Sequence, residues 1–166
     1  MELFKVNGKW NGKHLARHVI MPIAGGAIVG WLANRRSQET YKKLEKPSFS
    51  PPPAVFPIVW PLLYGTMGLA RYRVGEKSLQ KKNQEAQQPT YNVQLGLNYL
   101  WSFLFFKWNL RGTALVEMMV LLGAIMLNVY QFYEQDRTAG TLLLPYLGWV
   151  CFAMALNYGV WSLNKA

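Results

Sequence analysis

The sequence predicts an all-α fold, a polytopic membrane bundle of five transmembrane helices. Five long runs carry no charged residue, and each approaches or exceeds the roughly 17 to 25 residues that a helix needs to cross a bilayer. The runs lack the polar stripe of a soluble helix, and basic residues gather at their ends. The charge-free runs are residues 18–34, 47–70, 86–106, 118–133 and 138–164.

From these runs we place the spans at about residues 18–34, 53–72, 90–106, 113–133 and 140–163, so that residues 1–166 form a single transmembrane domain. The first run ends in Asn34-Arg35-Arg36 without the small-residue cleavage pattern of a signal peptide, so we interpret it as a retained span. Residues 1–17 form a basic, glycine-containing tail, which we expect to be mobile or to lie on the membrane surface.

The connections between the spans differ in character. Three prolines, Pro51 to Pro53, cannot continue a helix and favour a helix start, and Pro57 and Pro61 should bend or unwind the span that follows. Such a bend in lipid must be satisfied by neighbours or border a cavity, which predicts a pocket beside this span. Residues 71–90 are rich in Lys, Gln and Asn and are predicted to be a solvated loop. The short connections at 107–112 and 134–140 predict antiparallel neighbours.

The charge balance indicates a membrane and no nucleic acid. The chain has 18 Lys+Arg against 8 Asp+Glu, a formal charge of +10. The cations flank apolar runs and do not alternate with aromatic residues along one face, as they would in a nucleic-acid site. With five spans, one side of the membrane receives 10 of the basic residues and the other side 8, which leaves the orientation undetermined.

Few residues could support conventional catalysis or metal binding. The single cysteine, Cys151, excludes an internal disulfide framework, and the two histidines, His14 and His18, are better explained as surface groups of the tail than as metal ligands. No paired carboxylates, nucleophile with a base, or glycine-rich phosphate loop is present, so we predict no catalytic residue, no metal site and no obligatory cofactor. Glu117, near the start of the fourth span, is either a side chain that reaches the headgroups or a buried acid paired across helices.

Aromatic and amide side chains recur at helical spacing inside three spans. Gln94, Asn98 and Ser102 share one face of the third span, bordered by Trp101, which leaves two interpretations open. The amides could bond across helices, or they could orient a large, flat, mostly apolar ligand in a cavity walled by Trp and Tyr. The other residues of this pattern are Trp60 and Tyr64 in the second span and Trp149, Ala153, Leu156 and Asn157 in the fifth.

The same residues carry a resemblance to a known family. The matching segments are Leu44-Glu45-Lys46-Pro47-Ser48-Phe49-Ser50-Pro51-Pro52 with Val59-Trp60 and Leu63-Tyr64, then Gln94-Leu95-Gly96-Leu97-Asn98-Tyr99-Leu100-Trp101-Ser102, and finally Pro145-Tyr146-Leu147-Gly148-Trp149 with Leu156-Asn157-Tyr158. In order and spacing they resemble the signature of the translocator protein family, also called TspO/MBR or peripheral-type benzodiazepine receptor.

The resemblance implies a five-helix membrane bundle, often a homodimer, whose central cavity binds tetrapyrroles such as protoporphyrin IX or heme. In animal members it also implies cholesterol and benzodiazepine-type drugs as ligands. By motif, Trp60, Asn98 and Trp101 match pocket residues, and Ala153 and Leu156 match ligand-facing positions. The loop with Tyr41, Lys46 and Pro47 resembles the lid over the cavity.

Two departures bear on the function that the resemblance implies. Animal members carry a C-terminal cholesterol motif, whereas here Tyr158 is followed by six residues before Lys165, and Ser162 stands where those proteins have arginine. Bacterial members proposed to degrade porphyrins in light have a second pocket Trp where this chain has Tyr158.

Three functions follow as expectations: a membrane receptor or carrier for tetrapyrroles and sterols, a light-dependent porphyrin-degrading enzyme, and a ligand-regulated membrane scaffold. The predicted membrane is the mitochondrial outer membrane if the chain is eukaryotic, and otherwise a bacterial membrane.

Overall fold

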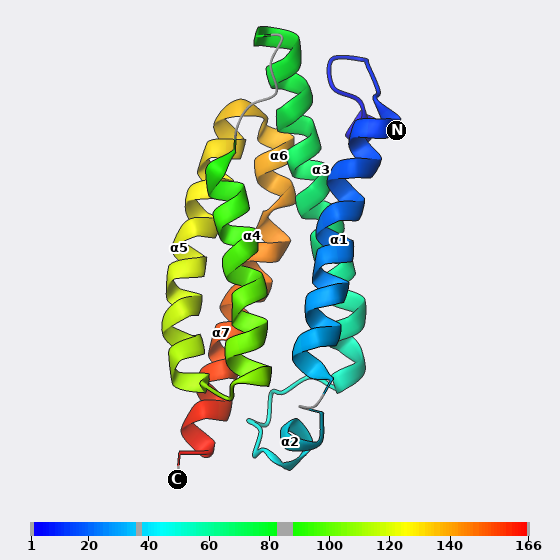
Figure 1. Cartoon of the computed structure of the whole chain (residues 1–166). Helices are drawn as coiled ribbons and strands as arrows, with labels where there is room; N and C mark the ends of the chain where they lie inside the picture. Colours follow the sequence, from blue (N-terminus) through cyan, green and yellow to red (C-terminus); the bar gives the residue numbers. More distant parts are fainter. Residues whose placement is uncertain (1, 36–37, 83–87, 166) are drawn as a thin grey trace.

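The computed structural model describes residues 2–35, 38–82 and 88–165, and apart from one isolated bridge between Val6 and Lys9 its regular elements are all helices (Figure 1). The all-α fold class is therefore confirmed. In chain order the elements are η1 (Glu2–Phe4), α1 (Gly12–Asn34), α2 (Gln38–Lys43), η2 (Pro53–Val55), α3 (Phe56–Lys82), α4 (Pro89–Ser102), η3 (Phe103–Lys107), α5 (Arg111–Gln135), α6 (Arg137–Leu142) and α7 (Leu144–Leu163).

Four helical segments of the described chain are long and apolar enough to cross a membrane: Gly12–Asn34, Pro53–Lys81, Arg111–Gln135 and Arg137–Leu163. The predicted third span differs, because α4 has only 14 residues, fewer than a membrane-spanning helix needs. It continues directly into η3, a π-helix of five residues. The structure therefore supports four candidate spans on length and composition, and a fifth predicted span whose helix changes type.

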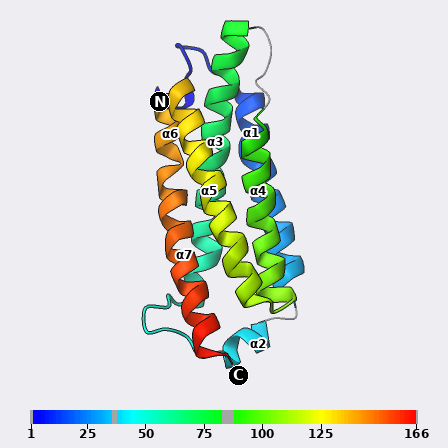
Figure 2. The same cartoon turned by 90° about the vertical axis from the view of Figure 1, so that its left-hand side faces the viewer.

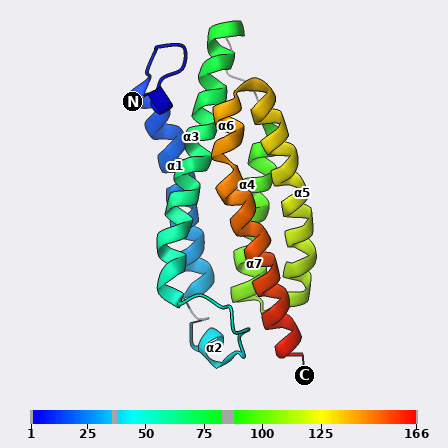
Figure 3. The ribbon, with the colours of Figure 1, turned by 180° about the vertical axis from the view of Figure 1, so that it is seen from behind.

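The long helices stand side by side as an antiparallel bundle (Figure 1, Figure 2). Around the bundle the order is α1, α3, α6 with α7, α5 and α4, and the ring closes where α4 meets α1. Figure 3 shows α6 against α3 from behind. We call the end with the N-terminus, the end of α3 and the α5–α6 junction the upper end, as drawn in Figure 1. The lower end carries α2 and the C-terminus.

Glycines set how closely the helices approach. A Cβ on Gly68 would lie 2.3 Å from the carbonyl oxygen of His18, so α1 and α3 touch backbone to backbone there. A Cβ on Gly26 would fall 2.1 Å from Cε2 of Tyr64, whereas Gly30 has nothing within 4 Å. Gly26 is therefore a packing position between α1 and α3, and Gly30 is not.

Several predicted boundaries are corrected. The prediction of a solvated loop from residue 71 is wrong for its first part, because α3 continues to Lys82; residues 83–87 of that loop lie outside the described residues. The predicted helix at 140–163 is divided at Leu143 into α6 and α7, and Pro145 occupies the first turn of α7, where its missing N–H costs nothing. The helix α1 begins before residue 18, at Gly12, where the side chain of Asn11 accepts from the amide of His14.

The N-terminal tail folds against α3, which corrects the prediction of a mobile or surface-lying segment. Val6 is only 1% exposed and packs with Leu69 and Tyr72 of α3. The hydroxyl of Tyr72 donates to the carbonyl of Phe4 and accepts from the amide of Asn11. The polar tail thus contains an apolar anchor, and Leu69 and Tyr72 of α3 supply the surface that receives it.

Candidate functional site

Four aromatic rings from three helices meet in the lower half of the bundle. We call Trp60, Tyr64, Trp101 and Trp149 the aromatic cluster. The ring of Trp60 stacks on Tyr64 at 5.6 Å between centroids, and it lies 6.3 Å from Trp101 and 6.5 Å, edge to face, from Trp149. Tyr64 and Trp101 are each 6% exposed, while Trp60 and Trp149 are half-buried. The spacing of Trp60 and Tyr64 by four residues places both rings on one face of α3.

The side-chain amides of two buried asparagines form hydrogen bonds with the aromatic cluster. The hydroxyl of Tyr64 donates to Oδ1 of Asn98 at 2.6 Å, and the indole N–H of Trp101 donates to Oδ1 of Asn157 at 3.1 Å. Asn157 in turn donates to the carbonyl of Arg111 at 2.9 Å, at the start of α5. Both amides are therefore bonded across helices, as the first of the two sequence interpretations expected.

Two buried donors of this site have no acceptor within the described part of the chain: Nδ2 of Asn98 and the indole Nε1 of Trp149. An unpaired polar group that is shielded from water costs free energy, and more so in a protein surrounded by lipid. These two N–H groups could therefore donate to a bound ligand. This also fits the second interpretation, a site that orients a ligand.

Ala153 and Leu156 lie on the buried face of α7, 5% and 6% exposed, in the same core as the cluster. The structure therefore places all eight residues predicted to bind ligand within one apolar core and its border. Their role in binding stays a prediction.

A chain of rings connects the cluster to the loop at the lower end. Trp101 stacks on Phe105 at 5.3 Å, and Phe105 contacts Phe106 at 4.8 Å. Both phenylalanines belong to η3, and both contact the ring of Tyr41 from the loop, at 6.3 Å and 5.7 Å. The π-helical turn, closed by the amide of Trp108 bonding to the carbonyl of Phe103, presents these two adjacent rings to the loop.

The loop whose sequence resembles a lid lies at the lower end of the bundle, with α2 below the long helices (Figure 1). Its role as a lid stays a prediction. The ammonium of Lys46 lies 4.8 Å above the ring of Tyr41 and donates to the carbonyl of Leu44. Pro47 packs on α7 where Gly159 has no side chain, since a Cβ there would lie 2.9 Å from Cγ of Pro47. Burial raises the pKa of the Tyr41 hydroxyl above its ordinary value.

The end of α7 holds the same loop by two hydrogen bonds. The amide of Glu45 donates to Oδ1 of Asn164, and Nδ2 of Asn164 donates back to the carbonyl of Glu45. The ring of Phe49 also contacts Phe152 at 6.2 Å. The loop is thus fastened by one asparagine and by contacts between uncharged rings.

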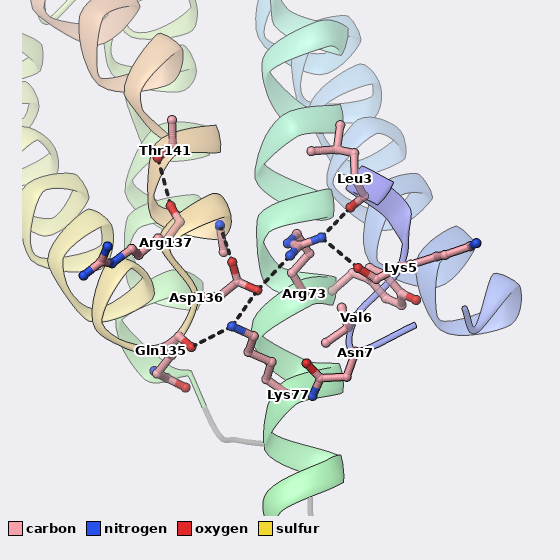
Figure 4. Close-up of polar contacts among 12 residues, drawn as sticks. Leu3, Lys5, Val6, Asn7, Arg73, Lys77, Gln135, Asp136, Arg137 and Thr141 are labelled. Atoms are coloured by element: carbon pink, nitrogen blue, oxygen red, sulfur yellow. Dashed lines mark hydrogen bonds and ion pairs between the residues drawn. The ribbon is translucent and has the colours of Figure 1, made fainter. Parts of the chain in front are cut away.

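The upper end contains a polar clamp, defined as Arg73, Lys77 and Asp136, that fastens the N-terminal segment and α6 to α3 (Figure 4). Arg73 bonds to Asp136 at 3.0 Å and to the carbonyls of Leu3 and Lys5, while Lys77 lies 3.2 Å from the same carboxylate. Burial opposes ionisation of Asp136, but the amide of Ala139 and the two cations outweigh it, so its pKa lies below the ordinary value.

Two open pockets, of about 500 and 580 Å³, are lined by residues outside the aromatic cluster. The first is bordered by the polar clamp together with Glu134 and Arg137. The second is a groove between α1 and α4. The rings of the aromatic cluster contact one another, so a ligand would enter by separating them.

Among the polar groups inside the bundle, sequence analysis named Gln94 and Glu117 but missed Asn128. Gln94 and Asn128 are 0% and 1% exposed, and their side-chain amide atoms have no partner in the described chain. Asn128 lies on one face of α5 with Ile125 and Phe132, a spacing that was available in the sequence. Glu117 is half-buried with both oxygens covered, and neither oxygen has a described partner, so the second of its two interpretations, an acid paired across helices, finds no partner among the described residues.

The fold and this site define a class: an α-helical integral membrane protein with an aromatic core beneath a covering loop. The model of the TspO/MBR family matches residues 18–162. The chain is 36% identical to the tryptophan-rich protein TspO of Archaeoglobus fulgidus over 150 residues, which cover 90% of this chain and 96% of that protein.

Two further relatives come from distant organisms. The human translocator protein is 39% identical over 126 residues, covering 75% of this chain and 74% of the relative. The tryptophan-rich sensory protein of Cereibacter sphaeroides is 36% identical over 143 residues, covering 86% and 84%. The chain therefore belongs to the TspO/MBR family, as the sequence motifs predicted.

Proposed function

We propose that this protein is a membrane receptor or carrier that holds a tetrapyrrole, such as protoporphyrin IX or heme, between the rings of the aromatic cluster. The observation that carries the proposal is the convergence of four rings from α3, α4 and α7 on two buried N–H donors that lack acceptors, at Asn98 and Trp149. Flat aromatic ligands stack on such rings, and a few donors fix their direction.

The covering loop supplies the route of entry in this proposal. The cluster is closed in the described state, so the loop at residues 38–53 moves away from α7 before the rings separate. Tyr41 links the two events, because its ring contacts Phe105 and Phe106, and Phe105 stacks on Trp101. The α4–η3 segment acts as the fifth span, and the protein works as a homodimer in the mitochondrial outer membrane of a eukaryotic cell or in a bacterial membrane.

Titration of the purified protein with protoporphyrin IX tests the proposal through the porphyrin absorption band, which does not depend on how many tryptophans a variant retains. Trp60→Ala should weaken binding at least tenfold, because Trp60 contacts the other three rings of the cluster. Trp31→Ala is the matched control, since Trp31 is 58% exposed on α1. Equal affinity in all three proteins would refute the site.

The same samples distinguish the other functions. Porphyrin that disappears under illumination faster than in protein-free detergent, and only with Trp60 present, would establish the light-dependent enzyme. Cholesterol that displaces the porphyrin would add a sterol to the ligands of this cavity. Crosslinked dimers that form or dissociate when porphyrin is added would support the ligand-regulated scaffold.

A further inference from the structure

The groove between α1 and α4 lies where the apolar parts of three helices end. Arg17 directly precedes the charge-free run 18–34, and Arg71 directly follows the charge-free stretch that ends at Ala70. Gln88 and Pro89, at the start of α4, complete the mouth of the groove. These three boundaries meet at one end of the bundle, so the mouth lies at the level of lipid headgroups.

The groove changes from polar to apolar along its length. Below the mouth its walls are formed by Met21 and Pro22 of α1 and by Leu95 and Tyr99 of α4. Tyr99 donates to the carbonyl of Pro22 at 2.9 Å, which ties the two helices together at this depth. The space of about 580 Å³ falls within the usual range of ligand sites, about 300 to 1,000 Å³.

The polar residues at the mouth are positioned by specific contacts. The guanidinium of Arg71 donates to Oε1 of Gln88 at 3.0 Å and lies 4.8 Å above the ring of Tyr91. Tyr91 is 2% exposed, lines the groove, and its hydroxyl has no hydrogen-bond partner in the described chain. Arg17 lines the same mouth from α1. The mouth thus combines two guanidinium groups with an unpartnered buried hydroxyl.

The neighbouring pocket at the same end is lined by both acidic and basic residues. There Glu134 and Asp136 lie among the cations, and Asp136 pairs with both Arg73 and Lys77. None of the described residues that line the α1–α4 groove is acidic. The charged residues in the described lining of the groove are Arg17 and Arg71, and an anionic headgroup is complementary to both.

We infer that the groove between α1 and α4 binds one anionic membrane phospholipid, with its phosphate beside Arg17 and Arg71 and an acyl chain along Met21 and Leu95. An amphiphile fits both ends of the groove, whereas a free phosphate would leave the apolar walls empty. The ring of helices closes at this seam, so a lipid seated here would fill the join between α1 and α4. The inference does not depend on a tetrapyrrole site.

Native mass spectrometry of the full-length protein from bilayers with equal amounts of phosphatidylglycerol and phosphatidylcholine tests this site. We expect one retained phosphatidylglycerol per protomer. Arg17→Gln should weaken retention about fivefold, and the double variant Arg17→Gln/Arg71→Gln more strongly, because each near-surface cation strengthens attraction of an anionic lipid by about that factor. Unfolding midpoints confirm that each variant is folded.

Two matched variants separate a site from general attraction. Arg137→Gln removes the same charge at the same end of the bundle but outside the groove, and should leave retention unchanged. Leu95→Trp keeps every charge but fills the apolar wall, and should expel the lipid. Retention of phosphatidylcholine at the same level, or an equal loss in Arg137→Gln, would overturn the inference. Displacement by inorganic phosphate alone would do so too, since it would indicate a small-anion site.

Discussion

The upper end of the bundle is fastened by buried charges, whereas the lower end is closed by rings and one asparagine. At the upper end, Asp136 is 2% exposed and binds two cations of α3, one of which also holds the N-terminal segment. At the lower end, the loop rests on Phe105, Phe106 and Phe152 and is held by Asn164. Removing one partner of a buried ion pair costs about 3 to 5 kcal/mol, whereas an aromatic pair contributes about 0.5 to 1.5 kcal/mol beyond its buried area.

This difference indicates which end of the bundle opens to admit a ligand. A site that a ligand enters must have a boundary of low local stability, and cooperative opening starts where few strong contacts hold. The aromatic cluster lies beside the weaker end. We therefore interpret the upper end as the fixed part of the molecule and the loop at residues 38–53 as the part that opens. The first and the last of the three predictions below test this division, and the second tests the packing of the aromatic cluster between them.

Removal of the clamp should have the largest effect on stability. Arg73→Met keeps the apolar part of the side chain but leaves Asp136 with one cation and frees the carbonyls of Leu3 and Lys5. The expected loss in unfolding free energy is about 3 kcal/mol, at the lower limit for breaking a buried ion pair. Thermal unfolding in detergent, followed by circular dichroism, measures it.

Arg137→Met is the control for the clamp, because Arg137 is exposed. Its guanidinium lies 6.0 Å from the centre of the Tyr133 ring, and this cation–π contact is the side-chain contact that the structure shows for it among the described residues. Its unfolding midpoint should match that of the unmodified protein. A similar midpoint in Arg73→Met would mean that the upper end is not the fixed part.

The positions of the helices could be predicted from the sequence because charge is excluded from lipid, and this pattern does not depend on tertiary contacts. The core face of α3 also followed from the spacing of Trp60 and Tyr64. The α5–α6–α7 boundary was less accessible, since the turn depends on Gly140 meeting the backbone of Tyr133, where a Cβ would lie 2.7 Å from its Cα. That requirement belongs to the folded chain.

The π-helix at Phe103–Lys107 and the folded N-terminal segment could not be predicted for a related reason. Phe105 and Phe106 are adjacent in the π-helix, and both rings contact Tyr41, which is far away in the sequence. Val6 becomes buried while the other described apolar residues around it, Leu3, Phe4 and Trp10, stay exposed. Its partner Tyr72 lies in a stretch that composition alone assigned to a loop. Both features arise from tertiary packing, which overrides local sequence signals.

The second prediction concerns the contact between α1 and the aromatic cluster. Gly26→Ala places a methyl group against the ring of Tyr64, and Tyr64 sits between Trp60 and Asn98. Overpacking of this kind typically costs about 1 to 3 kcal/mol. Gly30→Ala adds the same group where nothing lies within 4 Å, so unfolding should distinguish the two variants.

Gly26→Ala should also weaken porphyrin binding, because Tyr64 must shift, while Gly30→Ala should not. If both variants unfold like the unmodified protein, the close approach of α1 to Tyr64 is wrong. A weaker dimer in Gly30→Ala alone would assign that glycine to a face between copies of the chain.

The smallest effect on stability, and the most direct test of the moving end, is expected for Asn164→Ala. It removes both hydrogen bonds to Glu45, each worth about 1 kcal/mol at most in this exposed setting, so the unfolding midpoint should change little. The loop should open more often, because the rings and Pro47 then hold it alone. Hydrogen exchange of residues 38–53 should accelerate severalfold, and bound porphyrin should dissociate faster.

Ser162→Ala serves as its control, since Ser162 also lies near the end of α7 but bonds only within that helix, to the carbonyl of Gly159. If hydrogen exchange of the loop stays slow in Asn164→Ala, the contacts of Tyr41 with η3 hold the loop closed, and the hydrogen bonds of Asn164 do not. Faster exchange without faster porphyrin dissociation would separate the loop from the site, and the ligand would then have to enter between helices. If the ligand enters the aromatic cluster through the loop, the hydrogen-exchange rate of the loop and the dissociation rate of porphyrin should rise together.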